Sequence, residues 1–150
     1  MKNINEMSIA ICSDHAGFEL KETVKAYLAA QVKALKDFGT NSTASCDYAD
    51  FAHPFASAIE NAEFDLGISI CGSGNGITMT VNKHQAIRAA LCWNEEIVAL
   101  ARQHNNANVL SLPARFVSVE QALKMVDVFF STDFEGGRHQ ARIDKIPTCK

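Results

Sequence analysis

The sequence predicts a three-layer α/β/α sandwich, in which a doubly wound, Rossmann-like parallel sheet of five strands lies between two layers of helices. Two observations lead to this prediction. Short apolar runs alternate with segments of helical period along the chain. The apolar runs are continuous rather than alternating with polar residues, which is typical of strands in parallel sheets covered by helices on both faces. At 150 residues the chain has the usual size of one domain, so residues 1–150 are expected to form a single domain.

The predicted elements alternate between strand and helix, which is the pattern of parallel strands joined by crossover helices. The five apolar runs predicted as strands are 8–12, 33–38, 65–71, 87–92 and 107–112. The five segments predicted as helices are 18–31, 51–61, 77–84, 95–104 and 118–131. The polar stretch 39–45 is interpreted as a loop within the domain.

Charge and composition exclude several classes of function. Lys and Arg number 14 against 17 Asp and Glu, which gives a net charge of −3. The chain therefore has no broad cationic surface for nucleic acid or an anionic membrane. Residues 1–7 contain no apolar signal segment, and no stretch approaches the length of a membrane span. We therefore expect a soluble, cytoplasmic protein without a nucleic-acid or membrane partner.

The cysteines show neither a disulfide pattern nor a metal-binding pattern. There are five of them, an odd number, and they form no C-x-x-C pair and no metal-like spacing with histidine. Free thiols are typical of a reducing compartment. We expect no metal and no other cofactor.

Polar and reactive residues gather after the predicted strands. In a doubly wound sheet, ligands bind where strands end and helices begin, because unpaired N–H groups and helix dipoles converge at this edge. The turns at this edge are Ser13-Asp14-His15-Ala16-Gly17, Cys71-Gly72-Ser73-Gly74-Asn75-Gly76, Trp93-Asn94 and Pro113-Ala114-Arg115.

The most informative local motif is the turn 71–76, in which Gly72, Gly74 and Gly76 alternate with other residues. Its N–H groups can form a nest for a phosphate or a developing oxyanion, although a plain tight turn also explains the glycines. A dinucleotide site is a further alternative, since Glu95 lies about 20 residues on. The spacing is G-x-G-x-G and the turn follows the third strand, which argues against a nucleotide.

Four side chains are candidates for acid, base or nucleophile. Cys71 stands beside the nest, where N–H groups would favour a thiolate, but a buried structural cysteine is the alternative. Asp14 and His15 follow the first strand and would serve either as ligands or as capping groups. His104 closes a predicted helix, where the helix dipole favours a histidine even without a function.

Arg138 and Arg142 lie four residues apart and would share one face of a helix. Such a pair can clamp a phosphate, although it can also be an ordinary solvated face. Together with the nest, the pair indicates a phosphorylated polar metabolite as ligand. The reaction stays open on these grounds, because thiol, carboxylate and imidazole serve acyl transfer and proton transfer alike.

Taken together, the motifs resemble those of the type B ribose-5-phosphate isomerases. The wider family also includes galactose-6-phosphate isomerase subunits and isomerases of other sugar phosphates. The matching segments are Cys12-Ser13-Asp14-His15-Ala16-Gly17, Asp47-Tyr48, Cys71-Gly72-Ser73-Gly74-Asn75-Gly76, Asn82-Lys83, Arg102-Gln103-His104-Asn105 and Glu135-Gly136-Gly137-Arg138-His139. The resemblance covers nearly the whole chain in order, and the last two segments resemble the ribose branch more than the galactose branch.

The resemblance implies an aldose–ketose isomerase of the pentose phosphate pathway, which interconverts ribose 5-phosphate and ribulose 5-phosphate through a cis-enediolate. It implies that Cys71 is the base and that His104 acts in opening the furanose ring. The residues implied to contact the sugar, the enediolate or the phosphate are Asp14, His15, Tyr48, Gly72, Ser73, Gly74, Asn75, Gly76, Asn105, Arg115, Arg138 and Arg142. It also implies a homodimer, or a tetramer of two such dimers, whose sites draw residues from both chains.

Two departures from the family pattern leave the substrate open. Ala49 stands where many relatives have proline, and Pro113 stands where a glycine commonly precedes the strand-end arginine. Both positions border the sugar and phosphate region, so allose, galactose or tetrose phosphate is the alternative substrate. From another class of function, the alternative is a nucleotide-binding regulatory module.

Overall fold

The computed structural model describes residues 2–148 and contains a five-stranded sheet of order β2-β1-β3-β5-β4, in which every neighbouring pair is parallel. The strands are β1 (Ser8–Ser13), β2 (Ala34–Asp37), β3 (Leu66–Cys71), β4 (Ala89–Leu91) and β5 (Val109–Pro113). The helices are η1 (Ile4–Glu6), α1 (Phe18–Leu28), α2 (Tyr48–Glu60), α3 (Asn75–Val81), α4 (Glu95–Asn105), α5 (Val119–Ser131) and α6 (Arg138–Ile143).

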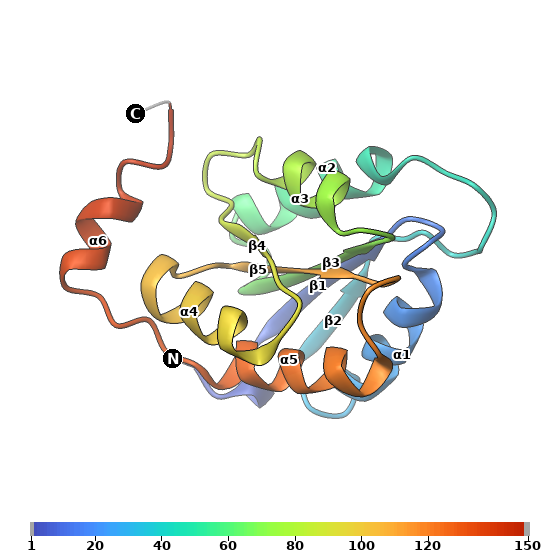
Figure 1. Ribbon diagram of the computed structural model, residues 1–150, viewed down its shortest axis with the longest axis horizontal. Helices are drawn as coiled ribbons and strands as arrows, with labels where there is room; N and C mark the ends of the chain where they lie inside the picture. The colour runs from blue at the N-terminus through green and yellow to red at the C-terminus, as the bar shows by residue number, and fades with distance from the viewer. Residues whose placement is uncertain (1, 149–150) are drawn as a thin grey trace.

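Helices cover both faces of the sheet (Figure 1). On one face α1, α4 and α5 pack through a core that includes Val24, Leu110 and Phe129. On the other face α2 and α3 pack through Phe55 and Ile77. Because successive strand residues point to opposite faces, each central strand contributes to both cores. The predicted three-layer, doubly wound fold is confirmed.

Side-chain caps determine where two of the helices begin. The Asn94 side chain accepts a hydrogen bond from the Ile97 N–H at the start of α4, and the Ser118 hydroxyl accepts one from the Gln121 N–H at the start of α5. Asn106, with φ of 45°, ends α4 in the left-handed conformation. Across the described part of the chain, no helix is long and apolar enough to cross a membrane.

Several elements differ from the sequence prediction: α1 and α3 each end three residues before the predicted end, and α6 lies outside the predicted helices. Helix α2 begins at Tyr48, three residues before the predicted start. Pro54 is most favourable in a first helical turn, which suits a later start, but α2 accommodates it as an interior residue. Strand β4 is only three residues long, and the Asn82 carboxamide pairs with both the N–H and the carbonyl of Ala89 in this strand.

A buried ion pair supports the end of β1. The Lys21 side chain is 0% exposed and contacts the carboxylates of Asp37 and Glu22. Asp37 also accepts the Gly39 N–H at 2.9 Å, and the Gly39 carbonyl accepts the Ser13 N–H at 2.7 Å. Burial raises the pKa of Asp37, but hydrogen bonds from the two lysines and Gly39 outweigh it and hold the pKa below its ordinary value. The pair thus anchors the segment that borders Asp14.

Four cysteines, at positions 12, 46, 71 and 92, are free thiols. The fifth, Cys149, lies outside the described residues. The described thiols agree with the expectation that the chain lacks a disulfide framework.

Candidate functional site

Cys71 ends β3 and lies at the focus of the glycine-rich turn. The residue is 4% exposed, and the backbone N–H groups of Ile77, Gly74 and Ser73 donate to its thiol. The turn requires glycine at position 74, because φ is 78° there and a Cβ atom would overlap the side chain of Leu91. The N–H groups therefore form a nest that converges on the sulfur.

The protonation of Cys71 differs from what the sequence predicts. Burial raises the pKa of this thiol above its ordinary value and outweighs the lowering by the nest, and the charge of Asp14 raises it further. The N–H groups do favour the thiolate, as expected, but in the isolated chain burial outweighs them. A thiolate at this position needs additional positive charge nearby.

Asp14 and His15 lie next to the nest, at the end of β1. The buried Asp14 carboxylate accepts the Gly17 N–H at 3.0 Å, and the Asp14 N–H donates to the carbonyl of Ile70 at 3.2 Å. A backbone hydrogen bond therefore joins Asp14 to Ile70, the residue that precedes Cys71. The His15 Nδ1 atom lies 3.2 Å from both the backbone N and the backbone O of Cys46, so the ring nitrogen that can reach a ligand is Nε2.

Tyr48 and Arg115 complete this side of the molecule. The Tyr48 ring, at the start of α2, lies so close to Gly76 that a Cβ atom there would overlap it. The Arg115 N–H donates to the Gly72 carbonyl at 3.0 Å, and its guanidinium lies 3.3 Å from the position of a Cβ on Gly72. We call this set the thiol cluster: Asp14, His15, Tyr48, Cys71, Gly72, Ser73, Gly74, Asn75, Gly76 and Arg115.

The remaining predicted residues lie in a second group, around the end of α4. His104 is in the last turn of α4 and Asn105 ends it, while Arg138 and Arg142 lie one turn apart on α6, both exposed. A hydrogen bond of 3.0 Å from the Glu135 N–H to the Gln103 carbonyl holds the segment before α6 beside α4. We call this set the imidazole cluster: His104, Asn105, Glu135, Arg138, His139 and Arg142.

His139 and Glu135 are members of the imidazole cluster that the sequence reasoning missed. The His104 and His139 rings stack with centroids 4.4 Å apart and planes 10° apart. A Glu135 carboxylate oxygen lies 3.9 Å from His104 Nε2 and 3.6 Å from His139 Nε2. Burial and the positive charge of His104 and Arg138 lower the pKa of His139. The four-residue spacing of Glu135 and His139 is the signal that would have found them.

The imidazole cluster also brings together residue types that can bind a metal ion. One ligand atom from each of His104, Glu135 and His139 lies within 4.8 Å of the others. A metal ion must lie in the plane of each imidazole that binds it, and two parallel stacked rings share no such point. For both imidazoles to bind one ion, at least one ring would have to turn out of the stack.

The two clusters lie at opposite ends of the strands, one at the carboxyl ends and the other at the amino ends. Cys71 ends β3, whereas His104 precedes β5, which runs parallel to β3 with Gly67 paired to Val109 and Cys71 paired to Pro113. The four strand steps between these pairs alone separate the two ends by about 13 Å. Figure 1 shows α6 and the end of α4 on one side and the turn after β3 on the other. Within one chain, Cys71 and His104 do not share a site.

Comparisons with known proteins agree on one family. The Ribose/Galactose Isomerase family model matches residues 9–146. A probable ribose-5-phosphate isomerase B of Mycoplasma genitalium is 48% identical over 141 residues, which are 93% of both chains. The crystal structure of a ribose 5-phosphate isomerase from Thermotoga maritima has a TM-score of 0.91 at 48% identity and covers 94% of this chain and 97% of that one. The Mycoplasma genitalium enzyme with bound ribulose-5-phosphate has a TM-score of 0.87 at 48% identity, covering 93% of both chains.

Proposed function

The chain belongs to the Ribose/Galactose Isomerase family, and on this premise we propose that it interconverts ribose 5-phosphate and ribulose 5-phosphate. The observation that most supports this reaction is the Cys71 thiol at the focus of the glycine nest. A proton-transfer base beside oxyanion-binding N–H groups is what enediolate chemistry requires. The ribulose-5-phosphate bound in the Mycoplasma genitalium relative supports the same substrate pair.

The proposed reaction has three steps. His104 first moves a proton from the C1 hydroxyl to the ring oxygen, which opens the furanose and frees the C1 aldehyde. The Cys71 thiolate then removes the C2 proton, and the electron pair moves to the C1 oxygen to give a cis-enediolate. The nest N–H groups and the Ser73 hydroxyl stabilise that oxygen. The thiol finally returns the proton to C1, while the proton of the C2 hydroxyl passes to the C1 oxygen, which yields the ketose.

The other cluster residues bind the two ends of the substrate. Sugar hydroxyls are recognised by a carboxylate, a phenol and an amide, from Asp14, Tyr48 and Asn105. The phosphate dianion is bound by His15, whose Nδ1 is held by the Cys46 backbone, and by the three arginines of the clusters, Arg115, Arg138 and Arg142. Arginine suits this role because its planar fork pairs with two phosphate oxygens at once.

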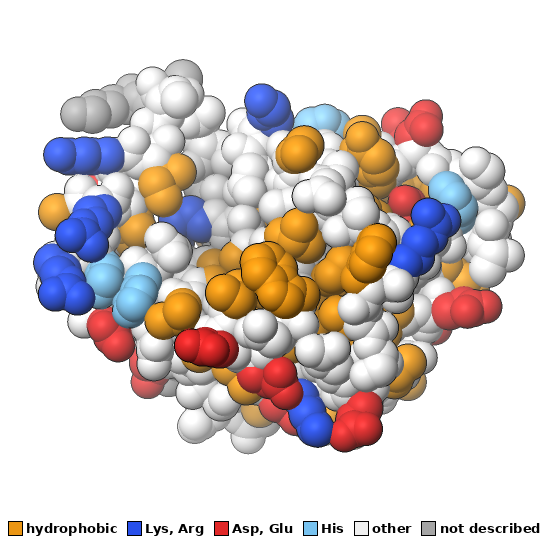
Figure 2. Space-filling model, viewed as in Figure 1, with side chains coloured by type: hydrophobic (Ala, Val, Ile, Leu, Met, Phe, Trp, Pro, Cys, Tyr) orange, Lys and Arg blue, Asp and Glu red, His pale blue; other side chains and the backbone are white. Residues whose placement is uncertain are grey.

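Because the thiol and imidazole clusters are separated within one chain, the complete site takes one cluster from each of two chains of a homodimer. An apolar face offers the contact: Met79 of α3 is 66% exposed, Trp93 after β4 is 53% exposed and Leu100 of α4 is 37% exposed. Figure 2 shows apolar side chains in the middle of this face, with His and Lys or Arg side chains at both ends. A two-fold axis through the patch would place the thiol cluster of each chain next to the imidazole cluster of the other, which gives two identical composite sites.

The homodimer also supplies the charge that Cys71 lacks in the isolated chain. In the composite site, Arg138 and Arg142 of the partner subunit approach the thiol from the imidazole cluster. Positive charge close to a thiol stabilises the thiolate and lowers its pKa. Catalysis by a free thiol requires a reducing compartment, which supports a cytoplasmic location.

Incubation with ribose 5-phosphate and detection of the ketose tests the function. Turnover of ribose 5-phosphate should exceed that of a panel containing allose 6-phosphate, galactose 6-phosphate and a four-carbon aldose phosphate. Preference for another member of the panel would reject the substrate but keep the reaction class. Binding of sugar phosphates without conversion of any would reject the enzyme in favour of a regulatory binding module.

A further inference from the structure

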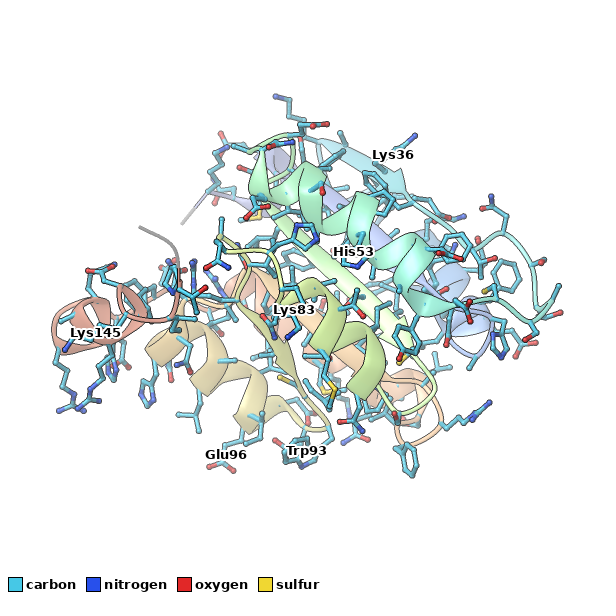
Figure 3. All side chains as sticks on the ribbon, turned by 90° about the horizontal axis from the view of Figure 1, so that it is seen from above. Lys36, His53, Lys83, Trp93, Glu96 and Lys145 are labelled. Atoms are coloured by element: carbon cyan, nitrogen blue, oxygen red, sulfur yellow. The ribbon has the colours of Figure 1, made fainter. Side chains whose placement is uncertain are left out.

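A chain of three side chains outside both clusters links α2 to the turn that follows α3. In that turn, His84 Nδ1 lies 3.1 Å from the Glu60 carboxylate, and His84 Nε2 lies 3.0 Å from Nδ1 of His53 on α2. The second oxygen of Glu60 accepts the Ala86 N–H at 3.0 Å. Figure 3 shows His53 on α2 beside the turn that carries Lys83.

With both rings neutral, the hydrogen bonds are consistent with one proton position on each ring. An ionised carboxylate only accepts, so His84 donates to Glu60 from Nδ1, and its neutral ring presents a lone pair at Nε2. His53 then donates from Nδ1 to that lone pair. An imidazole held by a carboxylate at one nitrogen, with the other nitrogen free to bind, is the arrangement of metal-ligating histidines in proteins.

We propose that His84 Nε2 and His53 Nδ1 bind a divalent transition-metal ion such as Zn²⁺, with Glu60 orienting the His84 ring. Zn–N bonds of about 2.0–2.1 Å in a tetrahedral site place two ligand nitrogens about 3.3 Å apart. The present separation of 3.0 Å needs to widen by only a few tenths of an ångström. When the ion enters, the His53 proton moves from Nδ1 to Nε2, and water fills the remaining positions.

Ring geometry separates this pair from the stacked histidines of the imidazole cluster. The His53 and His84 rings are tilted by 48°, with centroids 5.3 Å apart, so they are not stacked, and their hydrogen bond aims the two ligand nitrogens at the space between them. The His104 and His139 planes are only 10° apart. His53 is exposed on the surface of α2 and can turn toward the ion.

The ligand types and the charges favour an ion of the zinc class. Imidazole binds Zn²⁺, Cu²⁺ and Ni²⁺, whereas Mg²⁺ and Ca²⁺ prefer oxygen ligands. The Glu60 carboxylate offsets part of the ion's charge and of the positive charge that Lys83 brings to the same turn. A bound ion would cross-link α2 to the connection between α3 and β4, and would stabilise the folded state in proportion to its occupancy.

Zinc binding to the full chain tests the site, by equilibrium dialysis and by thermal unfolding with and without Zn²⁺. Wild type should bind the ion and unfold at a higher Tm in its presence, whereas Mg²⁺ should have no such effect. His53→Asn should lose both the bound ion and the Tm shift, and Glu60→Gln should weaken binding roughly 10–100-fold. His139→Asn is the matched control, because it removes an imidazole from the other histidine pair and should retain both.

His53→Asn decides the result, since His53 is exposed, whereas His84→Asn would also break the bond to Glu60. Wild type that binds no Zn²⁺, or His53→Asn with unchanged zinc affinity and Tm shift, would overturn the proposal. Loss of the ion in His139→Asn would overturn it as well and would assign zinc to the imidazole cluster. Isomerase activity does not enter these measurements, so the outcome is independent of the proposed function.

Discussion

At Cys71, burial and hydrogen bonding act on the thiol in opposite directions. Burial raises its pKa, and the nest N–H groups lower it by a smaller amount. The balance keeps the thiol protonated until further positive charge arrives. In the proposed mechanism, Cys71 would therefore become reactive only when the partner subunit completes the site.

Replacement of Cys71 tests its role as the base. Cys71→Ala should lower kcat by about 10²–10⁴-fold, the usual cost of losing a general base, with little change in ribose 5-phosphate affinity, because the thiolate acts on a proton in the transition state. Cys71→Ser should be nearly as inactive. Steady-state kinetics and calorimetric titration measure the two effects.

Cys92 provides the matched control for this replacement. Its thiol is also buried, and burial raises its pKa to about 12, so it stays protonated. Cys92→Ala should retain turnover. Near-normal kcat in Cys71→Ala would assign the base to another residue.

A role of His104 in ring opening predicts a substrate-dependent effect. His104→Asn should slow the reaction of ribose 5-phosphate, which is largely cyclic, far more than that of a four-carbon aldose phosphate that cannot form the furanose. The reason is that the open-chain substrate bypasses the step that His104 performs. The ratio of the two kcat/KM values measures this difference, and equal slowing of both substrates would remove ring opening from the role of His104.

At the scale of elements, the alternation of apolar runs with helical segments was sufficient to predict five parallel strands and the helices that join them. The glycine-rich turn after β3 was also predictable, because alternating glycines between a strand and a helix favour a nest. The stacking of His104 on His139 was not, because it depends on how α6 docks against α4. The Asp37 contact with Lys21 was likewise hidden, since it joins β2 to α1 across the fold.

The Lys21–Asp37 pair allows a test of how the end of β1 is held. Asp37→Asn should lower the free energy of unfolding by about 3–5 kcal/mol, because it leaves the fully buried lysine charge without its main partner. Lys21→Met should cost much less, since Asp37 keeps the contact with Lys25 and the Gly39 N–H. Chemical denaturation of the two variants measures the difference, and equal losses would contradict this assignment.

The same pair contributes to stability as a function of pH. The folded-state pKa of Asp37 is lowered, so its contribution is present above the ordinary carboxyl pKa of about 4 and is lost as the pH falls through the folded-state value. Part of the acid-induced loss of stability of the wild type should therefore be absent in Asp37→Asn.

For the whole molecule, chain topology separates the residues of the site. In a parallel sheet, a crossover helix runs back along the strands. The end of a strand and the end of a helix therefore lie at opposite ends of the strands. The order of the motifs therefore already separated Cys71 from His104, since His104 precedes the last strand. What the order could not indicate is the proposed contact surface, because the exposure of Met79 and Trp93 depends on how α3 and β4 pack in the folded chain.

A charge in this apolar face should dissociate the proposed dimer. Met79→Glu places a carboxylate in the patch, where burial without a partner is costly, so the variant should be a folded monomer with little activity. Light scattering coupled to size exclusion gives the mass, and circular dichroism checks the fold. Ala26→Glu, at an exposed position of α1, should remain dimeric and active. A dimeric, fully active Met79→Glu would place the interface elsewhere.

We propose that each active site combines the thiol cluster of one chain with the imidazole cluster of another. Cys71→Ala and Arg138→Ala, each inactive alone, are unfolded together and refolded as a mixture. Random pairing makes about half of the dimers mixed, and in these one site carries both lesions while the other carries none. The mixture should therefore regain about a quarter of the wild-type activity.

The matched control pairs two lesions from the same cluster, Cys71→Ala and Asp14→Asn. Every site of such a mixed dimer keeps one lesion, so no activity should return. A Cys71→Ala and Arg138→Ala mixture no more active than its parents, with mixed dimers shown to be present by mass spectrometry, would contradict the shared site.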